Sequence, residues 1–240
     1  TTLLGLLLAP ALALAQADPG KKVDPEINEQ FHREGAAKNF IQRFESHDRE
    51  VFNRRNEIVA ALGLKPGMKV ADVGAGSGLF TRLFAEKVGE GGRVYAVDVS
   101  KDFLKHIADD AAKRGLKQVE TVLGSQASTE LKPESVDLVF LSDVYHHFED
   151  HEAMLASIRQ ALRPGGTLIL IEFDRKEGCS SDFVLKHVRA DQAQFVKEIQ
   201  DAGFTLDAEG PRPAGLKENF FARFRKPAEE AEPRAAESRP

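Results

Sequence analysis

The sequence predicts an α/β fold built on one seven-stranded, mostly parallel sheet. Short apolar segments alternate with segments of helical periodicity from residue 68 onward. A glycine-rich turn follows the first apolar segment, and a carboxylate ends the second. Alternating strands and helices favour parallel strands joined by right-handed crossovers.

We expect strands at residues 68–73, 93–98, 119–123, 136–141, 166–173, 204–209 and 218–225. We expect helices at residues 78–88, 101–114, 150–163 and 187–202. Asp150 can cap the third of these helices, and Gly203 ends the last one. No helix is expected between the last two strands, which are separated by residues 210–217, beginning Gly-Pro-Arg-Pro. This segment is too short for a parallel crossover, so we expect the two strands to pair antiparallel.

The N-terminal segment 1–17 is predicted to be a signal peptide. Its apolar run is too short to span a bilayer comfortably, and it leads to small-x-small cleavage patterns around Ala15. If the segment is a signal, the protein is exported to the periplasm or secreted; otherwise it is cytoplasmic. We expect no membrane span in the mature form.

The rest of the chain divides into three parts. Residues 18–30 are polar and contain proline and glycine, so they are predicted to be a linker. Residues 31–226 form the folded domain, in which residues 31–62 make an N-terminal helical cap, with Asp48 able to begin one of its helices. Residues 227–240 consist of Pro, Ala, Glu, Arg and Ser and are predicted to be disordered.

Composition excludes some classes of function. A formal charge of −5 and a pI near 5.9 argue against a nucleic-acid partner, which favours a basic face. The single cysteine, Cys179, rules out an internal disulfide and a cysteine-rich metal site.

The glycine turn indicates a nucleoside site. Gly74, Gly76 and Gly78 follow a buried strand and precede a helix, where backbone N–H groups can approach a ligand closely. Asp98 ends the next strand, twenty residues after Gly78, and can accept both hydroxyls of a ribose. Leu79 occupies the position of the third glycine of a dinucleotide fingerprint, which disfavours a nicotinamide oxidoreductase.

Four segments together resemble a known family. Residues 71–78, Ala-Asp-Val-Gly-Ala-Gly-Ser-Gly, resemble motif I of the class I S-adenosylmethionine-dependent methyltransferases. Val-Asp at 97–98 resembles their ribose-binding acid, residues 135–140 their fourth-strand motif, and residues 162–168 their L-x-P-G-G turn into the fifth strand. The matches occur in the family's order along residues 57–225.

The resemblance implies a Rossmann-like three-layer sandwich with one antiparallel strand near the edge of the sheet. It implies S-adenosylmethionine (SAM) as the cofactor, with the three glycines under its methionine part, Asp98 on the ribose and Val99 beside the adenine. Asp72 would organise the turn or meet the amino group through water.

Other cofactor contacts are expected at the same edge of the sheet. Many relatives carry an acid after the third strand for the adenine amino group, but this chain has none before Glu130, so Gln126 is expected there. Ser142 and Asp143 leave the fourth strand and are expected to line the cofactor site.

The segment Tyr145-His146-His147 should face the transferred methyl group. One interpretation makes these residues the acceptor site, with a histidine as base because its pKa lies near neutrality. Alternatively, the histidines only pack and bond to the backbone.

A metal held by Asp143, His147 and His151 is a further alternative to both readings. A helix beginning at Asp150 breaks the i, i+4 register of these residues, and no H-E-x-x-H is present. We therefore predict no metal ligands.

A second candidate wall is the segment 186–191. His187 or Arg189 could bind an anionic acceptor there, although a solvated helix start is the simpler interpretation. Arg49, Arg54 or Arg55 of the cap could likewise reach a carboxylate.

The sequence therefore predicts an enzyme that moves a methyl group from SAM to a small-molecule acceptor by in-line displacement. The alternative is a non-catalytic SAM- or nucleoside-binding module of the same fold. The predicted export motivates this alternative, because SAM is made in the cytosol.

Overall fold

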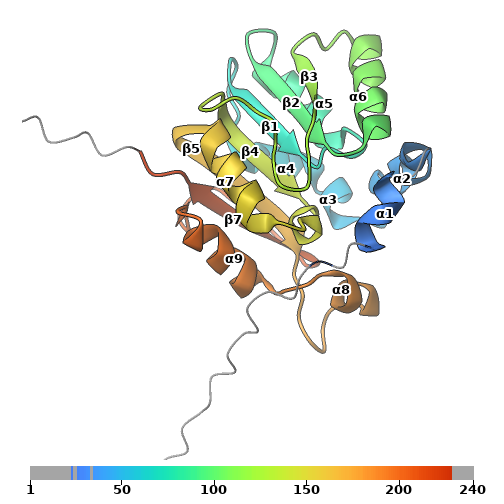
Figure 1. Ribbon diagram of the computed structural model, residues 1–240, viewed down its shortest axis with the longest axis vertical. Coiled ribbons are helices and arrows are strands. Elements are labelled where there is room, and N and C mark those ends of the chain that lie inside the picture. The colour runs from blue at the N-terminus through green and yellow to red at the C-terminus, as the bar shows by residue number, and fades with distance from the viewer. Residues whose placement is uncertain (1–22, 24–25, 33–34, 229–240) are drawn as a thin grey trace, which may run out of the picture.

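The computed structural model describes residue 23, residues 26–32 and residues 35–228. The predicted signal segment and residues 229–240 of the predicted tail lie outside them. The described residues form one seven-stranded sheet of order β3-β2-β1-β4-β5-β7-β6 (Figure 1). Its strands are β1 (Lys69–Val73), β2 (Arg93–Asp98), β3 (Val119–Leu123), β4 (Val136–Ser142), β5 (Leu162–Phe173), β6 (Thr205–Leu206) and β7 (Asn219–Arg225).

The strand directions confirm the predicted fold. β1, β2, β3, β4 and β5 pair in parallel, whereas β7 runs antiparallel to both β5 and β6. β6 keeps only two of its six predicted residues. The carboxyl ends of β1, β2 and β4 therefore meet at one edge, which is where an open parallel sheet binds ligands.

Helices cover both faces of the sheet and make three layers (Figure 1). Alternate strand residues face opposite sides, so Val70 and Leu138 pack on one face while Ala71 and Val139 pack on the other. The first face is covered by α4 (Arg55–Leu62) and α5 (Leu79–Val88). The second is covered by α7 (His151–Ala161) and α9 (Gln192–Asp201). α6 (Lys101–Arg114) packs beside β2 and β3.

Asp150 caps α7 as predicted, since its side chain accepts a hydrogen bond of 2.9 Å from the backbone N–H of Ala153. The predicted helix 187–202 is wrong at its beginning. α8 (Asp182–His187) and α9 replace it, because Asp191 caps a new helix by accepting from the N–H of Gln194.

The N-terminal cap also differs from the prediction. Part of the expected linker forms α1 (Glu26–His32), followed by α2 (Ala36–Phe44) and α3 (Glu50–Asn53). Asp48 does not cap α3, which begins after Arg49; the Asp48 carboxylate instead accepts from the hydroxyl of Ser46. α1 forms because tertiary contacts hold it: the Phe31 ring lies 5.0 Å from that of Phe40 and 5.3 Å from that of His147.

Candidate active site

Only glycine fits the turn after β1 at the two positions where neighbouring side chains come closest to its backbone. Gly74 and Gly76 have φ of 72° and 52°, which an L side chain rarely adopts. A Cβ on Gly74 would lie 2.3 Å from Val144, and one on Gly76 would lie 3.2 Å from the Phe44 ring. The turn is therefore a narrow cradle between β4 and the N-terminal cap.

Gly78 has a different role from the one predicted. It begins α5 with φ of 75°, and a Cβ there would lie 2.9 Å from Ile107 of α6. Gly78 does not line the cavity beside the turn. Gly78 instead allows α5 and α6 to pack closely, which corrects the prediction that it lies under the cofactor.

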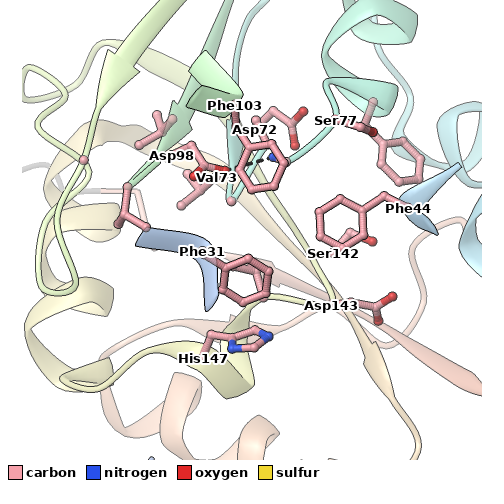
Figure 2. A pocket seen from close by; sticks show the side chains of 18 of the residues that line it. Phe31, Phe44, Asp72, Val73, Ser77, Asp98, Phe103, Ser142, Asp143 and His147 are labelled. Atoms are coloured by element: carbon pink, nitrogen blue, oxygen red, sulfur yellow. Dashed lines mark hydrogen bonds between the residues drawn. The ribbon is translucent and has the colours of Figure 1, made fainter. Parts of the chain in front are cut away.

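Asp98 ends β2 beside the turn. Its carboxylate accepts 2.9 Å hydrogen bonds from the backbone N–H groups of Gly76 and Ser100, which fix its orientation. Asp98 lines the cavity (Figure 2). Val99, the next residue, lines it as well. A carboxylate has about four acceptor sites, so it can accept further hydrogen bonds from a ligand.

Asp72 lies at the buried base of the same cavity. It accepts a 2.6 Å hydrogen bond from the Thr81 hydroxyl. Burial raises the pKa of Asp72 to about 7, an effect that the Thr81 hydrogen bond opposes and the charge of Asp98 reinforces. Its protonation is therefore sensitive to the charge of whatever occupies the cavity.

The Asp143 carboxylate is held by two side chains that the sequence did not identify as its partners. It accepts hydrogen bonds from Arg49 at 2.5 Å and from the amide of Asn219 at 2.6 Å. Burial raises the pKa of Asp143 to about 6, against the lowering effect of Arg49. Of the three arginines considered above, Arg49 thus reaches a carboxylate that lines the cavity, and that carboxylate belongs to the protein itself. Arg54 pairs with Glu57 on the exposed surface.

We call the space beside the turn the cofactor cavity. The predicted residues Asp72, Gly74, Gly76, Asp98, Val99, Gln126, Ser142 and Asp143 all line it. The aromatic rings of Phe31, Phe44 and Phe103 line it as well, although the sequence did not single them out (Figure 2). A glycine cradle, a carboxylate at the end of β2 and apolar walls fit the amino acid, ribose and adenine parts of the expected cofactor.

A second cavity adjoins the first between the cap, η1 (Tyr145–His147) and α8. His146, His147 and His187 line it, together with the aromatic rings of Phe40, Phe173 and Phe183. Asp143 and His147 line both cavities, so they mark the boundary between them.

The structure corrects the prediction that Tyr145 lies at the acceptor site. Its side chain is fully buried in the core, and its hydroxyl donates a 2.9 Å hydrogen bond to Glu198 of α9. Arg189, one of two residues considered for an anion site, pairs with both oxygens of the same carboxylate at 2.7 and 2.6 Å. Both residues stabilise the packing of α9, and neither lines the cofactor cavity or the second cavity.

The expected histidine base is also corrected. Burial lowers the pKa of His146 to about 3, and burial with the neighbouring histidines lowers the pKa of His147 well below its ordinary value. Both imidazoles are neutral at physiological pH and accept protons poorly. The alternative set of Asp143, His147 and His151 does not form, since His151 faces Glu198 at 3.8 Å and lines neither cavity.

Part of the chain is similar to known methyltransferases. Residues 71–170 match a family described as "Methyltransferase domain". The ubiquinone/menaquinone biosynthesis C-methyltransferase UbiE of Shewanella piezotolerans is 32% identical over 120 residues, covering 49% of this chain and 47% of that protein. The chain thus spans about half the length of the curated relatives it matches.

Two solved structures show the same fold. A SAM dependent methyltransferase from Aquifex aeolicus aligns with a TM-score of 0.66 at 23% identity, over 78% of this chain and 97% of that one. Phosphoethanolamine N-methyltransferase 2 of Haemonchus contortus, solved in complex with S-adenosyl-L-methionine, aligns with a TM-score of 0.55 at 23% identity, over 71% of this chain and 45% of that one.

Proposed function

We propose that this chain, which carries a class I S-adenosylmethionine-dependent methyltransferase domain, moves a methyl group from SAM to a small-molecule acceptor. One observation carries the proposal: the cofactor cavity and the second cavity meet at Asp143 and His147. A donor in the first and an acceptor in the second would lie side by side at that boundary.

Different residues of the cofactor cavity would bind different parts of SAM. Asp98 would hold the ribose hydroxyls, Val99 and Phe103 would flank the adenine, and the carboxylate of Asp72 would lie toward the amino group. When bound, SAM supplies a methyl group on a sulfonium, and its transfer needs little acid–base help. Alignment of the two reactants can then provide roughly 7–11 kcal/mol of the barrier.

The cap would exclude water from the reacting atoms. Phe31 and Phe44 line both cavities, and the Phe44 ring lies 5.8 Å from that of Phe103. Arg49 holds Asp143 from the same cap, so it neutralises a carboxylate that would otherwise face the acceptor. Aromatic rings on the second cavity favour a flat, largely apolar acceptor.

The test combines binding with turnover. Calorimetry should show SAM binding to the purified protein. Transfer of radiolabelled methyl from SAM should then be detected with one class in a panel of phenols, hydroquinones, amines and thiols. Binding without transfer to any acceptor would support the non-catalytic module, and absence of SAM binding would overturn the proposal.

No helix in the described part of the chain is long and apolar enough to cross a membrane. Cys179 is exposed in the loop before α8, with no pairing partner among the described residues.

A further inference from the structure

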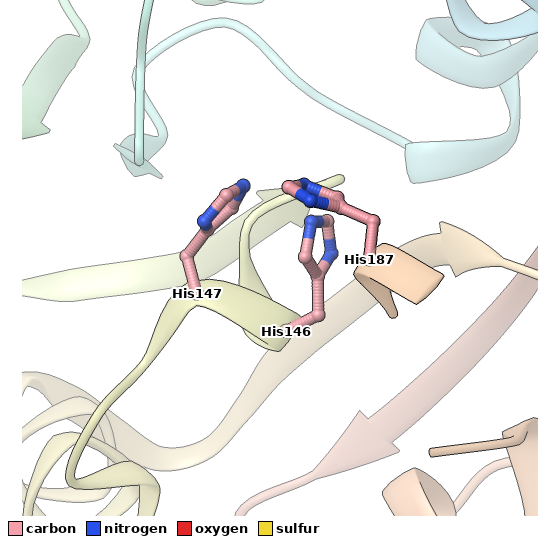
Figure 3. A group of neighbouring side chains, drawn as sticks. All are labelled: His146, His147 and His187. Carbon is pink, nitrogen blue, oxygen red and sulfur yellow. The ribbon is translucent and has the colours of Figure 1, made fainter. Parts of the chain in front are cut away.

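Three histidine side chains meet on the wall of the second cavity. His146 and His147 come from η1, and His187 ends α8 (Figure 3). One ring nitrogen from each lies within 4.8 Å of the other two. The His146 ring centroid lies 4.1 Å from that of His147 and 4.9 Å from that of His187.

The tautomer of His147 is set by Asn28. The side-chain NH₂ group of Asn28 donates to the backbone carbonyl of His147 and to the carboxylate of Glu149, both at 2.9 Å. These two acceptors fix the orientation of the Asn28 amide and so identify its other end as the oxygen. That oxygen lies 2.8 Å from Nδ1 of His147, which therefore carries the proton and donates. The lone pair of His147 is left on Nε2.

His146 is oriented by a buried carboxylate. Its Nδ1 lies 2.8 Å from Oε2 of Glu172, although the carboxylate is out of line with the ring N–H. Both side chains are almost fully buried, and neither Nδ1 nor Nε2 of His146 has a hydrogen-bond partner among the described residues. A buried, unpartnered ring nitrogen destabilises a protein unless something binds it.

We propose that His146, His147 and His187 bind a divalent first-row transition metal, with zinc as the best fit. Three imidazole nitrogens are ligands that zinc prefers, whereas Mg²⁺ and Ca²⁺ require oxygen. Metal-bound histidines almost always pass their other N–H to a carboxylate or carbonyl oxygen. The Asn28 oxygen occupies this position for His147, and the Glu172 carboxylate lies 2.8 Å from Nδ1 of His146, where a small turn of the ring would bring it into line. This assignment replaces the sequence prediction of no metal ligands.

Binding requires a small closure. Zinc–nitrogen distances of about 2.0–2.1 Å in a tetrahedral site place the nitrogens about 3.3 Å apart, which is closer than the 4.8 Å limit observed. His187 is the side chain that can approach. It is half-buried, and α8 has no buried residue to hold it in place.

The fourth coordination position would open onto the second cavity, which all three histidines line. Water would fill it in the resting protein, as in catalytic three-histidine zinc sites. The metal would lower the pKa of an acceptor hydroxyl or thiol that replaced this water, and the released proton would pass to solvent in the second cavity. This last role rests on the proposed function, whereas metal binding itself does not.

Zinc titration of the metal-stripped full chain, with any affinity tag removed, tests the site. Competition against a chromophoric chelator should show one zinc per chain. His187→Ala should weaken zinc binding about 100-fold or more, and Glu172→Gln should weaken it about 10- to 100-fold. His106→Ala, a histidine on α6 away from the cluster, should bind zinc like the wild type.

His187→Ala should keep its melting temperature and SAM affinity, because His187 does not line the cofactor cavity. Mg²⁺ at millimolar concentration should not compete. The proposed site would be overturned if the His187→Ala and Glu172→Gln variants bound zinc as tightly as the wild type. It would also be overturned if the wild type did not bind zinc at all. Failure of SAM binding with zinc binding intact would instead refute the proposed function alone.

Discussion

At the scale of single residues, Asp98 shapes the cofactor cavity, and we propose that it also binds the ribose of the cofactor. Replacing it with Ala removes two acceptors of backbone N–H groups as well as the ribose contacts. Each hydrogen bond to a charged acceptor contributes roughly 1.5–3 kcal/mol. Asp98→Ala should therefore weaken SAM binding about tenfold or more in calorimetry.

Asp109→Ala is the matched control, because Asp109 pairs with Lys105 on the exposed face of α6. Such surface pairs contribute little. Unchanged SAM affinity in Asp98→Ala, with the control also unchanged, would contradict the ribose assignment.

Asp72 makes stability depend on pH. Burial raises its pKa from 3.8 to about 7, so the folded state keeps a proton that the unfolded chain releases between these values. The free energy of unfolding should therefore fall as pH rises from about 4 to about 7. Asp98 and Thr81 are the groups that face this carboxylate.

Thermal melts of the wild type and of Asp72→Asn between pH 4.5 and 8 isolate this effect. The asparagine can still accept from Thr81 but does not titrate, so the variant should gain stability relative to the wild type as pH rises. If the melting temperatures of the two proteins changed equally with pH, Asp72 would not be the source of the pH dependence.

At the scale of elements, Glu50 joins the cap to the sheet. Its carboxylate accepts from the backbone N–H groups of Lys217, Glu218 and Asn219 at 2.7, 2.8 and 2.9 Å. This junction sets α3 beside β7, where Arg49 and Asn219 both reach Asp143. The cap is therefore attached at the site that it covers.

Glu50→Ala should lower the free energy of unfolding by about 1–3 kcal/mol, because a charged acceptor of three backbone bonds is lost. Hydrogen exchange should rise in residues 36–53 before it rises in the sheet. Glu57→Ala on α4 is the control, since Glu57 makes only an exposed pair with Arg54. Equal effects of the two variants would rule out a special role for Glu50.

At the scale of the whole molecule, we propose that residues 1–17 direct export. Fractionation of the native protein should find a mature form that begins near Gln16 or Asp18, outside the cytosol. Mass spectrometry of an intact N-terminus in the cytosol would contradict export. That result would also place the protein where SAM is made.

Local features of the sequence were sufficient for the sheet and for the glycine turn and carboxylate that line the cofactor cavity. The strand, the glycine turn and the helix after it lie within residues 69–88, and Asp98 ends the next strand. Hydrophobic periodicity and the absence of a Cβ act over a few residues, so the sequence shows them directly. Parallel pairing then brings these segments to one edge of the sheet.

Tertiary packing alone decided the rest. α1 forms because Asn28 and Phe31 find His147 more than a hundred residues away. Tyr145 turns into the core while His146 beside it faces the second cavity, and no periodicity indicates that choice. The histidine cluster needs His187 from a separate helix. Such contacts depend on which side chains meet when distant segments pack, and burial then sets their protonation, so neither can be read from neighbouring residues.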